Sequence, residues 1–281
     1  MLQLVRKVLL VDALGYGQFS GAPTVVIFLE APLDKFKMAS LSRELGSSQT
    51  VFVLAHNKTF LLRFFNQLLE IPLGGHSCHA AAHLIYELGL LPPSKPLTFL
   101  TQEGELAVKL TEPDSISVTF PAINLTKMDS ANLELYGSIL AIDPKNIAWG
   151  AMTASRQAII AVDATVMLKK LSPDRARLAK SGASTLAVTS AADTVGGEYS
   201  LRCFGPNENR PEQQVSVNIH RSLAPHWSRL LGTKKLQARQ LSGRGSLVQL
   251  DVSTPNQVVV TGRSRTVLRS DLVLELSDGL S

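Results

Sequence analysis

The chain of 281 residues has little cysteine: only Cys78 and Cys203 occur. Two cysteines exclude a disulfide scaffold and a cysteine-based zinc module, and we expect both to be reduced thiols in a cytoplasmic protein. Long apolar runs are lacking as well, because none approaches the roughly 20 residues that cross a bilayer. The apolar run at residues 8–11 ends at Asp12 and is too short for the core of a signal peptide. We therefore expect no membrane partner.

Charged residues are also scarce, at 18%, whereas hydrophobic residues make up 45% of the chain. This composition is typical of a globular protein and excludes a disordered one. Lysine and arginine exceed aspartate and glutamate by 28 to 23, which gives a net charge of +5. The basic residues are dense only at 169–170, 234–235 and 263–269, with no aromatic residues among them. This pattern favours a solvated basic surface over a nucleic-acid partner.

Signals for strands and helices alternate along the chain. In the first half we expect strands at residues 7–14, 24–29, 50–54, 59–65, 97–101, 105–110 and 115–120, and helices at 38–45 and 76–88. In the second half we expect helices near residues 130–142, 173–180 and 217–231, strands at 157–162, 184–189 and 199–204, and further strands to the end. Pro225 is expected to bend or restart the last helix.

A weak internal repeat divides the chain. Residues 63–65 match 202–204, His83 with 88–89 matches His226 with 231–232, and 104–106 match 245–247, at offsets of 139, 143 and 141 residues. The repeat predicts two similar lobes, and in each lobe a strand is followed by a loop and the loop by a helix. We expect residues 1–124, completed by the last strand at about 265–281, to form one lobe and residues 125–264 the other. The two loop–helix junctions are expected to face each other across one cleft.

The first junction comprises residues 70–77 and contains the pair Gly74-Gly75. Glycines let the backbone approach a ligand closely, and the free N–H groups of a helix start favour an anion. One interpretation is therefore that this junction binds a ligand with a carboxylate or an enolate. The alternative is a helix start that merely requires flexible residues.

Three histidines, His76, His79 and His83, follow on one face of the expected helix. His76 and His83 are two turns apart, roughly 10 Å, so the three imidazoles would not easily meet at one metal ion. We expect no metal here. His79 and His83 are expected to be packing or surface residues, and His76 to lie at the mouth of the site.

The second junction comprises residues 206–220 and is polar and rich in amides. Its side chains are Glu208, Glu212, Gln213, Gln214, Ser216, Asn218 and His220. One interpretation is a ligand-binding loop before a helix. An exposed surface loop is the alternative.

These residues resemble the PhzF-like isomerase family of phenazine biosynthesis over nearly the whole chain. Residues 11–13 and 19–23 (VDA, FSGAP) resemble V-D-A-F and F-x-G-N-P, and residues 63–65 with 70–76 (RFF, EIPLGGH) resemble R-W-F-T-P and E-V-x-L-C-G-H. Residues 97–106 resemble a strand pair typical of the family, and residues 243–246 its late glycine turn. Residues 204–220 with 223–227 are similar to F-x-P, E-D-P-V-T-G-S-A-H and L-A-P-Y-W.

The resemblance implies an α+β fold with two similar lobes, each a β-barrel-like sheet wrapped around a central helix, related by a pseudo-two-fold axis as in diaminopimelate epimerase. It implies a homodimer that binds a small molecule and requires neither a cofactor nor a metal. The family chemistry that it implies is an acid/base isomerisation, in which a proton moves along a small cyclic carboxylic acid.

The chain departs from the family pattern at both acid/base positions. Gln49, between Ser48 and Thr50, stands where the family motif S-E-T has its glutamate. Gln213 replaces the aspartate of the second motif. A primary amide has no accessible pKa near neutral pH and cannot carry a proton, and the loss of such a group typically lowers the rate about 10²- to 10⁴-fold.

Two further family residues of the second motif are replaced, and two histidines are kept. Val217 stands for a glycine and Asn218 for a serine, whereas His76 and His220 are retained. The candidate catalytic residues are therefore His76, Gln49 and Gln213. The candidate substrate-binding residues are Ser48, Gly75, Ser77, Val217, Asn218 and His220.

Three hypotheses follow from this set. The first is an isomerase whose acid/base groups are rebuilt around His76. The second is a catalytically silent relative that binds a small ligand or a protein. The third is a cleft that only shapes a reactive substrate, which then rearranges without proton transfer by the protein. All three require Gln49 and Gln213 to face one another between the lobes.

Overall fold

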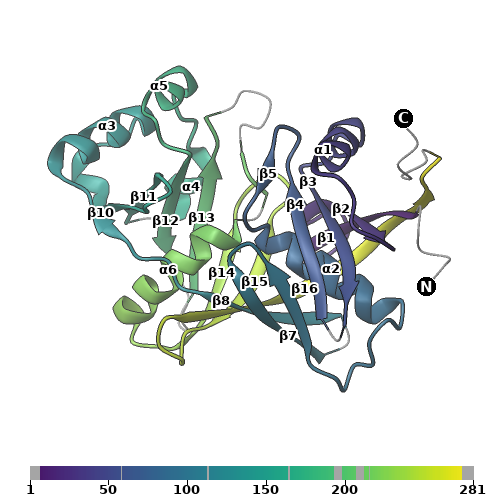
Figure 1. Cartoon of the computed structure of the whole chain (residues 1–281). Helices are drawn as coiled ribbons and strands as arrows, with labels where there is room; N and C mark the ends of the chain where they lie inside the picture. Colours follow the sequence, from purple (N-terminus) through teal and green to yellow (C-terminus); the bar gives the residue numbers. More distant parts are fainter. Residues whose placement is uncertain are drawn as a thin grey trace. The chain divides into compact units, whose positions relative to one another are not determined.

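The structure is a computed structural model that describes residues 7–57, 59–112, 114–163, 165–192, 198–206, 212–214 and 216–273, without the side chains of 165–167. The chain divides into two compact units. Unit 1 comprises residues 1–119 and 261–281, and unit 2 comprises residues 120–260. The elements of both units are labelled in Figure 1. Within the described residues, no helix is both long and apolar enough to span a bilayer.

Unit 1 is a closed ring of strands around one helix. Its strands are β1 (Lys7–Gly15), β2 (Ala22–Leu29), β3 (Gln49–His56), β4 (Thr59–Phe65), β5 (Glu70–Ile71), β6 (Leu97–Thr101), β7 (Gly104–Glu112), β8 (Ser115–Pro121) and β16 (Gln257–Asp271). The hydrogen-bonded order is β1-β2-β3-β4-β6-β7-β8-β16, and the pairing of β1 with β16 closes it. Strands β8 and β16 each run from one unit into the other.

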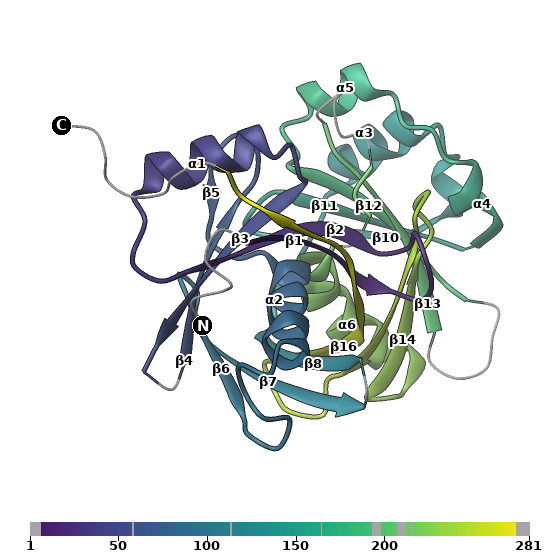
Figure 2. The ribbon, with the colours of Figure 1, turned by 90° about the vertical axis from the view of Figure 1, so that its right-hand side faces the viewer.

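The helix inside the ring is α2 (Gly75–Glu87), which Figure 2 shows running through the circle of strands. All of its residues from Gly75 to Ile85 are buried. A helix that is buried on every side needs apolar or small residues all round, and three consecutive alanines at 80–82 meet this need. A second helix, α1 (Lys35–Glu44), begins where the Asp34 carboxylate accepts hydrogen bonds from the backbone N–H groups of Phe36 and Lys37.

The loop between β1 and β2 requires glycine. Gly21 has a φ of +84°, and a Cβ atom there would lie 2.4 Å from the Ala13 carbonyl oxygen. The hydroxyl of Ser20 accepts hydrogen bonds from the N–H groups of Tyr16 and Gly17, both at 2.9 Å. These contacts fix the turn between the two strands that the sequence predicts at 7–14 and 24–29.

Unit 2 carries the second set of strands and most of the helices. Its strands are β9 (Thr126–Lys127), β10 (Ile147–Met152), β11 (Gln157–Val162), β12 (Thr185–Ala191), β13 (Glu198–Phe204), β14 (Lys235–Gln240) and β15 (Ser246–Asp251). They follow β16 in the order β15-β14-β13-β12-β11-β10-β9. The helices are α3 (Ser130–Leu140), η1 (Pro144–Asn146), α4 (Thr165–Lys170), α5 (Arg175–Lys180) and α6 (Val217–Leu231).

Helix α6 is the counterpart of α2 in the sequence repeat. It buries Ile219, His220, Leu223 and Ala224, and it ends at Gly232 with a φ of +67°. Pro225 lies inside the helix, so the prediction of a restart at this proline is wrong. Pro225 cannot donate to the Arg221 carbonyl oxygen, which instead accepts a hydrogen bond of 3.1 Å from the Ile123 N–H.

The α+β class, with an eight-stranded closed barrel sheet in unit 1, is confirmed. The predicted strands and helices are present, and the sequence prediction lacked five elements. These are β5, β9, β10, η1 and α4. Two of them, β5 and β9, have only two residues each and leave no periodicity to detect.

Candidate functional site

The first junction gathers Gln49 and Ser77 at the start of α2. The Ser77 hydroxyl donates a hydrogen bond of 2.6 Å to Gln49 Oε1. Gly74, which precedes the helix, makes room for this amide: a Cβ atom there would lie 2.6 Å from Gln49 Oε1 and 2.8 Å from Phe64 Cδ1. The side chain of Gln49 is therefore built into the helix start, next to Gly75.

Ser48 uses its hydroxyl within the protein. The Ser48 Oγ donates a hydrogen bond of 2.7 Å to the Pro23 carbonyl oxygen. Its neighbour Gln49 begins β3, which pairs in parallel with β2 through Thr24. Ser48 therefore holds the start of β3 against β2.

His76 lies in the first turn of α2 and is buried. Its Nε2 atom has no hydrogen-bond partner within the described part of the chain. Burial, and to a smaller extent the nearby His79, lowers the pKa of His76 to about 4. The imidazole is consequently neutral at neutral pH. Its free base form resembles a glutamate carboxylate in basicity, because glutamate has an ordinary pKa of about 4.3.

The other two histidines of α2 have separate partners. His79 Nδ1 is 3.0 Å from the Gly75 carbonyl oxygen, and His83 Nε2 is 3.1 Å from Thr266 Oγ1. Both side chains are buried, so the expectation of packing residues holds and that of surface residues is wrong. Across residues 7–273, as far as these are described, no three histidine, cysteine, aspartate or glutamate side chains gather where they could hold one metal ion.

In the second junction, Gln213 makes three hydrogen bonds. Its backbone N–H donates to the Cys203 carbonyl oxygen at 2.8 Å, and its Nε2 donates to Thr185 Oγ1 at 2.9 Å. Its backbone carbonyl oxygen accepts a hydrogen bond from Gln240 Nε2. Gln240 Oε1 in turn accepts a hydrogen bond of 3.1 Å from the Ser216 N–H. Gln240 thus connects the segment at Gln213 to the start of α6. Glu208, by contrast, lies outside the described residues.

The first turn of α6 holds the remaining candidates. Val217 is buried, and Asn218 Oδ1 accepts a hydrogen bond of 3.1 Å from Arg221 Nη1. His220 is fully buried, with Nδ1 at 2.7 Å from the Tyr199 hydroxyl. Burial lowers the pKa of His220 to about 3. His220 is therefore a neutral interior group that joins the first turn of α6 to Tyr199 of β13.

Each junction also contains an arginine–glutamate pair with two hydrogen bonds. Arg63 donates to Glu70 at 2.7 and 2.9 Å, and Arg202 donates to Glu212 at 2.8 and 3.0 Å. Hydrogen bonds from Arg63 hold the pKa of Glu70 below its ordinary value, although burial of this side chain, 5% exposed, opposes the shift. Lys35 approaches the same carboxylate at 3.3 Å. Each glutamate is therefore held by an arginine of the preceding strand.

The structure thus forms two groups from the predicted site residues. In unit 1, Gln49, Gly75, His76 and Ser77 lie at the start of α2, with Ser48 beside Gln49. In unit 2, Gln213, Val217, Asn218 and His220 lie at or just before the start of α6. The sequence prediction missed Thr185 and Gln240, which hold Gln213. They stand 28 and 27 residues away along the chain, so no local motif reveals them.

Comparison with known families identifies the family of the chain. The family model described as "Phenazine biosynthesis-like protein" matches residues 11–270. The chain belongs to this family. The predicted resemblance to the PhzF-like isomerases is confirmed.

The relatives of this phenazine biosynthesis-like protein extend over its full length. An "uncharacterized isomerase" of Pseudomonas aeruginosa is 32% identical, over 94% of this chain and 97% of the relative. Another of Halalkalibacterium halodurans is 28% identical, over 96% of this chain and 100% of the relative. The crystal structure of a PhzF family protein from Enterococcus faecalis superposes with a TM-score of 0.85 at 26% identity, over 95% of this chain and 99% of that one.

Proposed function

We propose that this phenazine biosynthesis-like protein is an isomerase homologue with an altered acid/base set. In this proposal it binds a small cyclic or carboxylate-bearing metabolite with both junctions, one in each lobe. Gln49 and Gln213 orient the ligand by hydrogen bonds, and His76 is the group that carries a proton. The homodimer that the resemblance implies and the cytoplasmic location expected from the cysteine content are part of the same proposal. Light scattering that gives twice the chain mass of 30.4 kDa would support the dimer.

The position of Gln49 carries the proposal. Its Oε1 accepts the Ser77 hydrogen bond and fits into the space left by Gly74. Its Nε2 has no partner within the described residues and can donate to a ligand oxygen. The resemblance puts a glutamate at this position, and an amide there can bind but cannot carry a proton.

His76 supports proton transfer because of its basicity. Its pKa of about 4 is close to the ordinary value of about 4.3 for glutamate, so neutral imidazole can replace the missing carboxylate as a base. The adjacent N–H groups at the start of α2 favour a ligand carboxylate or an enolate formed by proton removal. Gln49, Gly75 and Ser77 would hold this anion next to His76.

The experiment measures solvent deuterium incorporation into a dihydrobenzoate, a cyclic carboxylate with a mobile proton, by proton NMR. For the proposed isomerase, His76→Gln lowers the exchange rate at least about tenfold. His56→Gln, which removes an exposed histidine at the end of β3, is the matched control and leaves the rate unchanged. Exchange at the wild-type rate in His76→Gln would refute the role of His76.

A catalytically silent binding protein is the second candidate, and the internal partners of both amides favour it. Gln49 is bonded to Ser77, and Gln213 to Thr185. In this case the native chain binds the dihydrobenzoate without exchange, and the double substitution Gln49→Glu with Gln213→Asp creates exchange. If the native chain exchanges and the double substitution changes nothing, the chemistry never used these two positions. That outcome, together with an unchanged rate in His76→Gln, would favour a cleft that only shapes a reactive substrate.

A further inference from the structure

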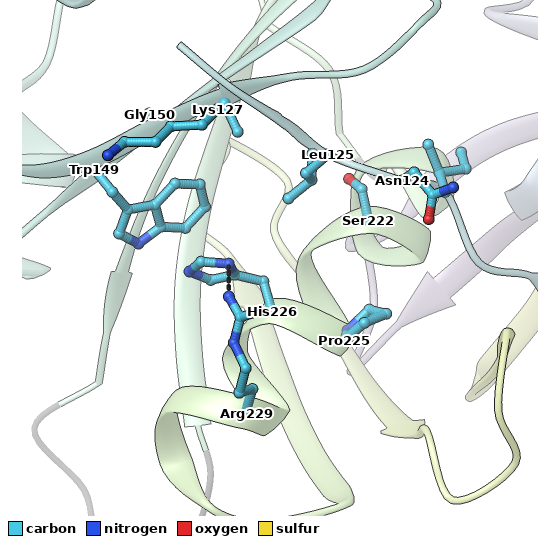
Figure 3. A pocket seen from close by; sticks show the side chains of 11 residues that line it. Asn124, Leu125, Lys127, Trp149, Gly150, Ser222, Pro225, His226 and Arg229 are labelled. Carbon is cyan, nitrogen blue, oxygen red and sulfur yellow. Dashed lines mark hydrogen bonds between the residues drawn. The ribbon is translucent and has the colours of Figure 1, made fainter. Parts of the chain in front are cut away.

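Unit 2 contains a pocket that the proposed function does not use. It has a volume of about 360 Å³ and lies between the segment 123–127, strand β10 and the second half of α6 (Figure 3). Pro225 is eight residues beyond Val217, so this end of the pocket is about 12 Å along the helix axis from the start of α6. Pockets of this size hold small organic molecules.

Two ring N–H groups in this pocket lack acceptors. The Trp149 and His226 rings are in contact, with centroids 3.8 Å apart and planes tilted by 42°. Arg229 Nη2 lies 3.3 Å from His226 Nδ1. A guanidinium can only donate, so Nδ1 is the acceptor and the proton of the neutral imidazole is on Nε2. His226 Nε2 and Trp149 Nε1 are both buried and have no partner within the described residues.

Unpaired donors of this kind require an explanation. A buried polar atom without a hydrogen bond is rare in proteins and is disfavoured by about 1–3 kcal/mol in mutational measurements. Both atoms have almost no accessible surface, so a ligand in the pocket contacts other atoms of the two rings, and the charges around the pocket select it. The imidazole stays neutral, because burial and the Arg229 charge both lower the pKa of His226.

The charges of the pocket are all positive. Lys127 and Arg229 line it, and none of its lining residues is an aspartate or glutamate. Neither cation forms an ion pair with a carboxylate in the part of the chain that the structure describes. The positive charge selects an anion over a neutral acceptor.

The remaining walls are apolar. Ile123 and Leu125 come from the segment after β8, Pro225 comes from α6, and the Trp149 indole adds an aromatic face. We propose that this pocket is a binding site for a small organic anion. An aromatic or alicyclic body packs on these apolar residues, and carboxylate or phosphate oxygens accept hydrogen bonds from the two cations.

The test follows the indole N–H signal of Trp149 by NMR during titration with benzoate. The chain has two tryptophans, so Trp149→Phe assigns the signal. Benzoate should shift it in a saturable way, with a dissociation constant on the order of 1 mM or lower. Benzamide, which has the same body without the charge, should bind at least about threefold more weakly. Absence of a saturable shift with benzoate, or an equal affinity for benzamide, would overturn the proposal.

Two variants test the cations, and two other ligands test the apolar walls. Arg229→Gln and Lys127→Gln should each weaken benzoate binding about threefold, whereas Lys235→Gln, an exposed lysine of β14 outside the pocket, should not. Retained backbone amide spectra show that the variants are folded. Phenyl phosphate should bind like benzoate, and its binding would identify phosphate as an accepted head group. Inorganic phosphate that binds as tightly as benzoate would contradict a role for the apolar walls, and unchanged affinity in both cation variants would refute the anion site.

Discussion

His76 makes the stability of unit 1 sensitive to acid. Its pKa is about 4 in the folded chain, against about 6.5 in an unfolded chain, because burial penalises the charged imidazolium. Between these values the unfolded chain binds a proton that the folded chain does not. The contribution of His76 to the free energy of unfolding is therefore complete above about pH 6.5 and is lost as the pH falls toward 4. A difference of about 2.5 units corresponds to about 3 kcal/mol.

Urea unfolding of the wild type and His76→Gln, from about pH 8 to about pH 4, measures this contribution. The difference between the two free energies of unfolding should change by about 3 kcal/mol over this range. Comparison with the wild type cancels the other buried groups, including His220. His56→Gln is a control for the loss of a histidine at an exposed position. If the His76 ring signal of the folded protein titrates near pH 6.5 instead of about 4, the argument from burial is wrong.

Three further substitutions test contacts at the two junctions. Gly74→Ala puts a Cβ atom 2.6 Å from Gln49 Oε1 and should lower the free energy of unfolding by about 1–3 kcal/mol in urea denaturation. Adding Gln49→Ala should restore part of the lost free energy of unfolding. If Gly74→Ala leaves the free energy of unfolding unchanged, the close packing is contradicted. Glu70→Gln leaves its arginine partner without a carboxylate and should lower stability by about 1–3 kcal/mol at neutral pH, with a smaller effect in acid because protonation already weakens the wild-type pair. Tyr199→Phe removes the hydrogen bond to His220 and should lower the free energy of unfolding by about 1–2 kcal/mol, which lowers the midpoint of thermal unfolding. An unchanged midpoint would show that this hydrogen bond adds nothing to stability.

The architecture could be predicted from the sequence because its signals are local or repeated. The buried strands β3 and β4 read as a hairpin, and the alanine-rich segment of α2 lies between a glycine pair and Gly89. The match between residues 63–65 and 202–204 reflects a real correspondence. In both places an arginine at the end of a strand pairs with a glutamate of the following loop.

The environment of the site could not be predicted in the same way. A strand such as β10 contains Ile147, Trp149 and Gly150 in a mixed pattern that carries no clear period of two. The burial of His79 and His220 depends on strands far away in the chain, such as β13 with Tyr199. Sequence spacing places these histidines on a helix face, but only the packing of the sheet decides whether that face meets solvent or protein.

Strands β8 and β16 each run from one unit into the other, and this has a consequence for folding during synthesis. Unit 1 is closed by β16, whose residues Arg263 to Asp271 pair with β1 near the opposite end of the chain. During synthesis, β1 therefore keeps one backbone edge unpaired until β16 has emerged from the ribosome. Unit 2 is consecutive and ends where β16 enters unit 1, so it can begin to fold while the first barrel is still open. A chaperone that shields nascent β1 would act during this interval, and translation stopped before β16 would release an open, aggregation-prone barrel.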